Sequence, residues 1–138
     1  MRRITMIGIL GATAMAACGC GGATGTFANK PRPPAPINIT GSVNDSRVLI
    51  SPTSFGAGPI NLYVTNAASQ SVTLTVRSAS GGPPVARLQS INPDTPGVVT
   101  FSPAPGDYQV SAGEPGIRPA ELHVGSERPS AANAVLQP

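Results

Sequence analysis

The stretch "INLYVTNAASQSVTLTV", residues 60 to 76, carries the pattern that decides the fold. Apolar Ile60, Leu62 and Val64 alternate with polar or amphipathic neighbours, and the same period of two returns in "VTLTV" at residues 72 to 76. Side chains of a β-strand point alternately to opposite faces, so this pattern predicts two strands with one face on a core and the other in water. The polar segment from Asn66 to Ser69 predicts the turn between them.

The same alternation recurs along the chain and extends the prediction to a whole domain. Further apolar positions at a spacing of two, or in short runs, are Ile37, Ile39, Val48, Ile50, Val98 to Phe101, Tyr108, Val110, Ala112, Leu122 and Val124. Turn signals separate these runs at Gly56 to Pro59, Gly81 to Pro84, Asn92 to Gly97, Pro103 to Gly106 and Gly113 to Gly116. Seven or eight short strands at regular spacing predict an all-β fold, an antiparallel two-sheet β-sandwich of Greek-key type over residues 37–125.

The register of that sandwich can be stated residue by residue. One set of side chains should point into the core: Leu62, Val64, Leu74, Val76, Val110 and Val124. Their neighbours should point outward: Asn61, Tyr63, Thr73, Thr75 and Gln109. A shift of one residue would invert both sets. The segment from Ser80 to Ser90 should avoid a central position in a sheet, because two adjacent prolines cannot donate ladder hydrogen bonds.

Composition limits the rest of the chain. The 138 residues include 16 prolines and 16 glycines, which excludes long helices and leaves room for one small domain. Nine Lys and Arg face six Asp and Glu. Because Arg2 and Arg3 would leave with the N-terminal segment described next, the remaining chain has a net charge of +1. Its cations are scattered singly, so a nucleic-acid partner is not expected.

The N-terminus has the pattern of an export signal. Arg2 and Arg3 precede an apolar run from Ile4 to Ala17 that is too short to cross a bilayer as a helix. The tetrapeptide Met15-Ala16-Ala17-Cys18 resembles the bacterial lipobox, although leucine is the usual residue where Met15 stands. The resemblance implies a signal peptide over residues 1–17 and a lipid-modified Cys18 at the mature N-terminus. The protein is therefore expected on the extracytoplasmic face of the cell membrane, with membrane lipid as a partner.

Other readings of the two cysteines are disfavoured. A disulfide between Cys18 and Cys20 would close a strained small ring, and a metal site lacks further ligands at suitable spacing. Modification at Cys20 instead would put Cys18 where alanine or serine is usual, so Cys20 is expected to remain a free thiol. Residues 18–36 should form a Gly/Pro-rich tether, and a disordered N-terminus without a spacing role explains the composition equally well. Residues 126–138 should form a flexible tail.

Three segments resemble the cupredoxin family. They are "ISPTSFGAGPINLYVTN" at residues 50 to 66, "SVTLTV" at 71 to 76 and "PAPGDYQVSAG" at 103 to 113. The resemblance covers about residues 45 to 125, and an immunoglobulin-like sandwich shares the same turn chemistry. Copper in that family needs two histidines, a cysteine and usually a methionine.

The resemblance implies where copper ligands would fall, and none is present. Ser71 or Val72 stands at the place of one histidine, and Ser111 and Ala112 stand at the place of the cysteine. No histidine or methionine follows within the expected loop. The chain is therefore expected to be a copper-free relative, with no metal ligands and no cofactor-binding residues.

The remaining polar residues are expected to be structural. His123 should be a solvent-facing strand residue, and Asp45, Asp94 and Asp107 should satisfy backbone donors in turns. No nucleophile and base stand in a recognisable relation, so no catalytic residue and no enzymatic activity are predicted. The sequence favours a non-catalytic module that is structural or binds an envelope protein or wall component; the alternative is a solute- or metal-handling lipoprotein related to cupredoxins.

Overall fold

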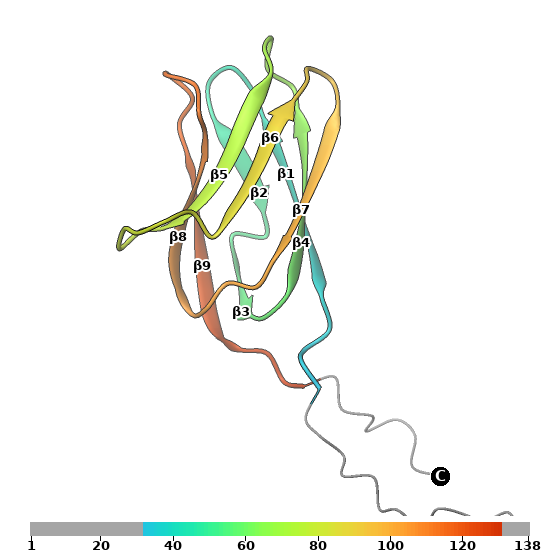
Figure 1. The fold of residues 1–138 in the computed structure, drawn as a ribbon, viewed down its shortest axis with the longest axis vertical. Coiled ribbons are helices and arrows are strands. Elements are labelled where there is room, and N and C mark those ends of the chain that lie inside the picture. Colours follow the sequence, from blue (N-terminus) through green and yellow to red (C-terminus); the bar gives the residue numbers. More distant parts are fainter. Residues whose placement is uncertain (1–31, 131–138) are drawn as a thin grey trace, which may run out of the picture.

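A computed structural model describes residues 32–130, and Cys18, Cys20, the expected signal peptide and most of the tether lie outside that range. The described chain is a β-sandwich of two sheets (Figure 1). One sheet has four strands in the order β2-β1-β4-β7, and the other has five in the order β3-β9-β8-β5-β6. The strands are β1 (Ile37–Val43), β2 (Val48–Ser51), β3 (Ser54–Ala57), β4 (Ile60–Asn66), β5 (Val72–Ser78), β6 (Ala86–Ile91), β7 (Pro96–Phe101), β8 (Gly106–Ala112) and β9 (Ala120–Glu127).

The all-β sandwich is confirmed, but its sheets are mixed instead of wholly antiparallel. β1 pairs with β4 in parallel, and β3 pairs with β9 in parallel. Both parallel pairs arise because the chain leaves the first sheet after β2, adds β3 to the second sheet and then returns as β4. Alternation of apolar residues shows which face a strand buries and is the same for either direction of pairing, so the sequence pattern could not reveal this crossover.

The described residues form nine strands, one more than the upper expectation. The additional strand is β3, which includes Gly56 and Ala57, two residues expected to lie in a turn. Phe55 is its only large apolar side chain, so the segment shows no alternation over four residues. The turn itself is confined to Gly58 and Pro59, where Gly58 has a φ of +122° that suits a residue without a side chain.

The predicted register is confirmed. Leu62, Val64, Leu74, Val76, Val110 and Val124 are all buried in a single core, with relative exposures of 2% or less. Tyr63 and Gln109 are exposed, and Asn61, Thr73 and Thr75 are partly exposed on the outward faces. At Gly41 of β1 the neighbouring strand β2 leaves no room for a side chain, because a Cβ there would lie 2.8 Å from the Leu49 carbonyl oxygen.

The proline-containing segment lies at the edge of the five-stranded sheet, as expected. β6 pairs only with β5, and its register shifts between the partners of Val72 and Leu74. Ser90, on the bulged side, has a φ of 52°, which is unusual for a residue other than glycine. Such a bulge in an edge strand disturbs the row of unpaired backbone groups that could otherwise join another chain.

Both ends of the described chain leave from the same end of the sandwich (Figure 1). β9 runs to Glu127, past the expected domain end at residue 125, and Arg128 then fixes this end of the molecule. Its guanidinium donates to the carbonyl oxygens of Gly56, Ala57, Pro59 and Ala35, at distances of 2.5 to 3.3 Å. Arg128 and the final residues of β9 therefore belong to the folded domain and not to the tail. Pro34, next to Ala35, is also buried.

None of the described residues forms a helix long and apolar enough to cross a membrane.

Candidate functional site

Four loops meet at the end of the sandwich opposite to the chain ends, and we call this end the loop pole (Figure 1). They are the connections β1–β2, β4–β5, β6–β7 and β8–β9, at residues 44–47, 67–71, 92–95 and 113–119. A backbone bridge between Arg47 and Arg118 joins the first loop to the last, and so links the two sheets. Loops held on a rigid sandwich in this way are a common place for binding residues.

A buried asparagine organises the loop pole. Asn66, at the end of β4, has no exposed surface, and its side-chain amide donates to the carbonyl oxygens of Gln70 (2.7 Å) and Ile91 (2.8 Å). Its carbonyl oxygen accepts from the backbone N–H of Ala68 at 2.9 Å. A buried amide is costly unless its hydrogen bonds are made, so these three contacts hold the β4–β5 loop against the end of β6.

An exposed carboxylate ties a second pair of loops together. Asp45 in the β1–β2 loop accepts hydrogen bonds from both the backbone N–H and the hydroxyl of Ser69 in the β4–β5 loop, each at 2.9 Å. The backbone hydrogen bond, followed by the hydroxyl, lowers the pKa of Asp45 below its ordinary value of 3.8. Asp45 therefore satisfies donors in another loop, 24 residues along the chain, where the sequence suggested donors in its own turn. The neighbouring Asn44 makes the local turn contacts instead, to Ser46 and Arg47.

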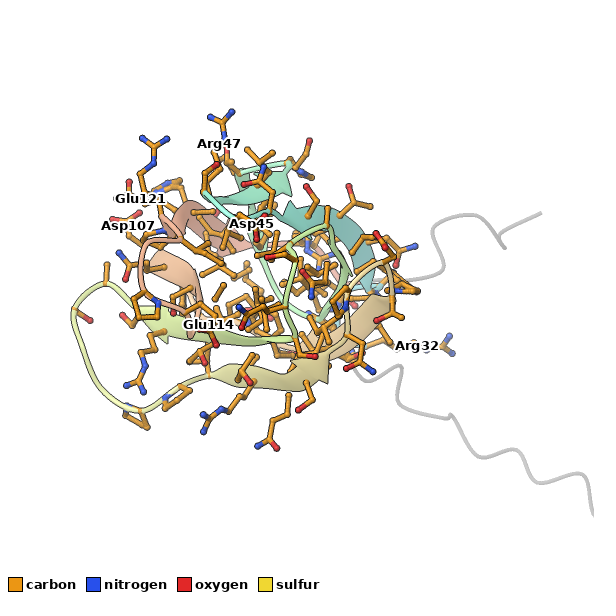
Figure 2. All side chains as sticks on the ribbon, turned by 90° about the horizontal axis from the view of Figure 1, so that it is seen from above. Arg32, Asp45, Arg47, Asp107, Glu114 and Glu121 are labelled. Carbon is orange, nitrogen blue, oxygen red and sulfur yellow. The ribbon has the colours of Figure 1, made fainter. Side chains whose placement is uncertain are left out.

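A small hollow of about 140 Å³ lies between these loops. Figure 2 looks down on the loop pole and shows Asp45 and Glu114 there, together with Arg47 projecting outward. The hollow is lined by Asp45, Ala68, Ser69, Gln70, Val72, Glu114, Pro115 and Ile117. Its polar rim and partly apolar floor could accept a small polar group. Within residues 32–130, no three His, Cys, Asp or Glu residues lie close enough together to hold a metal ion.

The positions that the cupredoxin resemblance assigned to copper ligands lie at the start of β5 and the end of β8, which are neighbouring strands, and Val72 lines this hollow. Val72 of β5 and Ala112 of β8 point inward, with exposures of 1% and 2%. Ser71 donates from its hydroxyl to the Asn92 side chain at 2.9 Å, and Ser111 is on the outward side of β8. Methyl and isopropyl groups thus fill the inward positions, and these side chains have no atom that can bind a metal.

A second group of polar residues lies on the outer face of the five-stranded sheet. His123 of β9 is exposed, as expected, but Asp107 lies in β8 and not in the expected turn, because β8 begins at Gly106. The two are register partners, and His123 Nδ1 lies 2.7 Å from Asp107 Oδ1. Sequence separation hid this pair, since only the antiparallel register of β8 and β9 brings the two side chains together.

This histidine has a hydroxyl residue on its other side. Ser54 of β3 is the parallel register partner of His123, so Ser54, His123 and Asp107 form a row across three strands at an open hollow of about 400 Å³. Figure 2 shows Asp107 and Glu121 projecting from this face. The His123 and Asp107 side chains are 66% and 70% exposed, and no hydrogen bond between Ser54 and His123 occurs in the described part of the chain. The row lacks the shielding from water and the aligned hydroxyl that a nucleophilic site requires.

Asp94, the third candidate carboxylate, does lie in a turn, between β6 and β7. It has a φ of 57°, a conformation that aspartate tolerates better than most residues, and its backbone N–H donates to the Asn66 carbonyl at 2.8 Å.

No protein-family model matches the chain, and no curated protein matches it. Among solved structures, a multicopper oxidase has 12% identity and a TM-score of 0.50, and the match covers 68% of this chain and 46% of the oxidase chain. A reduced auracyanin from Roseiflexus castenholzii gives 17% identity and a TM-score of 0.48, covering 65% of this chain and 96% of that one. Auracyanin A, a "blue" copper protein from Chloroflexus aurantiacus, gives 18% identity and a TM-score of 0.49, covering 66% of this chain and all of that one. The domain has a cupredoxin-like fold, and at these identities the likeness concerns the fold alone.

Proposed function

We propose that this protein is a lipid-anchored bacterial envelope protein whose small non-catalytic β-sandwich presents its loop pole away from the membrane. The anchor is Cys18 of the lipobox-like Met15-Ala16-Ala17-Cys18. The observation that carries the orientation is the position of the chain ends: residues 32–36 and 128–130 leave the domain opposite to the loop pole. A chain anchored at its N-terminus would then point the loop pole outward.

The clamp made by Arg128 supports this orientation. Its hydrogen bond to the Ala35 carbonyl, and the contact of the Ser130 hydroxyl with the Arg32 carbonyl, hold the last described residues against the end of the tether. Between Cys18 and Arg32 the chain can span at most roughly 45–50 Å. The domain would therefore remain close to the lipid surface, where it binds an envelope protein or a wall component.

The anchor is tested by expressing the full-length chain in a bacterial host that processes lipoproteins. Wild-type protein should incorporate a labelled fatty acid and fractionate with membranes, because two or three acyl chains bind a bilayer far more firmly than one. Cys18→Ser should abolish the label and leave the precursor uncut or release the protein. Cys20→Ser is the matched control and should behave as wild type. Normal processing and membrane retention of the Cys18→Ser protein would contradict the anchor.

The alternative, a solute- or metal-handling lipoprotein related to cupredoxins, is supported only by the fold. Val72 and Ala112 at the inward positions argue against a mononuclear copper centre, because a thiolate and imidazoles are its defining ligands. Titration of the Cys20→Ser protein with Cu²⁺, in which no free thiol remains beside the lipid-modified Cys18, should give no intense thiolate-to-copper absorption band. Such a band at one equivalent of copper would favour the alternative.

A further inference from the structure

Within the described residues, the outer face of the four-stranded sheet carries no charged side chain. Its eleven outward positions are Asn38, Thr40, Ser42, Leu49, Ser51, Asn61, Tyr63, Thr65, Pro96, Val98 and Thr100. We call this surface the neutral face. The corresponding face of the five-stranded sheet carries charged and titratable groups, namely Arg77, Arg87, Asp107, Glu121 and His123. Both faces belong to the same domain and are exposed to the same solvent. The lack of charged side chains on one of them therefore points to a surface specialised for contact.

Exposed apolar groups gather on the same surface. Within residues 32–130, four large hydrophobic side chains are exposed, and three of them, Leu49 (44%), Tyr63 (44%) and Val98 (51%), lie on the neutral face. Tyr63 and Val98 are direct register partners on β4 and β7. Absence of charge together with an exposed tyrosine is the composition found at the centre of binding surfaces.

Two further features give the neutral face a defined arrangement of polar groups. Next to Tyr63 and Val98, the Asn61 amide donates to Asn38 Oδ1 at 3.1 Å, and the Thr100 hydroxyl donates to Asn61 Oδ1 at 2.9 Å. This ladder crosses three strands and holds the Asn61 side chain in one orientation. On the other side of Tyr63, β1 and β2 form a shallow hollow of about 440 Å³, lined by Thr40, Gly41, Ser42, Leu49, Ile50 and Ser51.

The dimensions of the neutral face suit a narrow ligand better than a second copy of the chain. The four strands have four to seven residues each, and a spacing of about 4.8 Å with a rise of about 3.3 Å per residue gives a plane of roughly 380 Å². A stable protein interface buries about 800 Å² on each partner, so a dimer would need much more surface than this face supplies. The absence of charge also disfavours an acidic or basic partner, whose charges would lose water without gaining a counter-charge.

We propose that the neutral face binds an uncharged polysaccharide strand. A sugar ring presents C–H groups on its faces and hydroxyls around its edge, which matches an exposed aromatic ring flanked by amides and hydroxyls. Tyr63 supplies the apolar platform, Asn38 and Asn61 hydrogen-bond vicinal hydroxyls, and the hollow beside β2 receives the neighbouring sugar. The site lies away from the loop pole and does not depend on the lipid anchor.

The test uses the full-length protein in a sugar-free non-ionic detergent, titrated separately with chitohexaose and cellohexaose by calorimetry. At least one of them should bind, and its affinity should change little between about 0.05 and about 0.5 M salt, because no charges are involved. Tyr63→Ser should weaken this binding about tenfold or more, and Tyr63→Phe, which keeps the ring, should remain within about twofold of wild type. Asn61→Ala should also weaken it, by several-fold.

Val85→Ser is the matched control, because Val85 is 43% exposed but lies outside the neutral face, and it should bind as wild type. Thermal unfolding of each variant confirms that the fold is retained. Failure of both oligosaccharides to bind folded wild-type protein would overturn the proposal, as would equal binding by Tyr63→Ser. Sedimentation that shows a dimer lost in Tyr63→Ser would assign the neutral face to a second copy and overturn it too.

Discussion

Replacing Asn66 with alanine should destabilise the domain by about 1.5 to 4.5 kcal/mol. Asn66 is fully buried and makes three hydrogen bonds through its side chain, to Gln70, Ile91 and Ala68. Each such bond contributes about 0.5–1.5 kcal/mol net, and buried backbone groups that lose their partner add to the cost. The substitution removes all three bonds and leaves the Ala68 N–H and the Ile91 carbonyl without the side-chain contacts seen here.

Asn61 is a control on the same strand and of the same residue type. Its side chain also makes two hydrogen bonds, but it lies on the partly exposed outer face, where water can replace both partners. Asn61→Ala should therefore cost well under about 1 kcal/mol. The two substitutions delete the same atoms from β4 and differ by one hydrogen bond, so a much larger loss at Asn66 reports mainly its burial.

Urea unfolding followed by far-UV circular dichroism measures both free energies. The slope of the free energy against urea should stay constant, so that the midpoints report stability directly. If the Asn66→Ala and Asn61→Ala proteins unfold within about 0.5 kcal/mol of each other, burial does not decide the value of these hydrogen bonds and the reasoning fails.

Two further predictions concern the core and the loop pole. Leu74→Ala, at a fully buried position of β5, should cost about 2–5 kcal/mol, whereas Thr75→Ala on the outward side should cost well under about 1, and equal losses in the same urea assay would refute the register. The lowered pKa of Asp45 means that its contribution to stability is fully present above 3.8 and is lost as the pH falls through the lower folded-state value. Asp45→Asn should flatten the acid side of the stability profile below about pH 4, and superimposable profiles for the two proteins would show that this carboxylate plays no such part.

The buried faces of most strands could be predicted because burial leaves a local trace in the sequence. Leu62, Leu74 and Val110 are apolar for the same reason that they are inward: a side chain facing the core must leave water. The edge position of β6 agrees with the prediction made from Pro83 and Pro84, but both prolines lie in the loop before the strand, so they do not themselves account for it. β3 was missed because four residues with two small side chains show no alternation.

The candidate sites could be predicted only in part. The absence of ligand atoms at Val72 and Ala112 follows from residue identity and the family resemblance. The contacts of Asn66 with Ile91, of Asp45 with Ser69 and of His123 with Asp107 do not, because each joins residues that are 16 or more positions apart in the chain. The role of Arg128 was hidden for the same reason: it lies in a segment without periodicity, and its acceptors are backbone carbonyls that any sequence would provide.

The sequence by itself determined the all-β class, the inward and outward faces of the main strands and the lipobox-like motif, because each depends on residues that are close together in the chain. Only the tertiary structure decided the parallel pairing of β1 with β4 and the hydrogen bonds by which Arg128 holds the two chain ends together. It also decided that Leu49, Tyr63 and Val98 lie together on the neutral face. Those features depend on how strands far apart in the sequence pack side by side. Packing of that kind is set by the summed burial of all the strands, and no short stretch of sequence carries it.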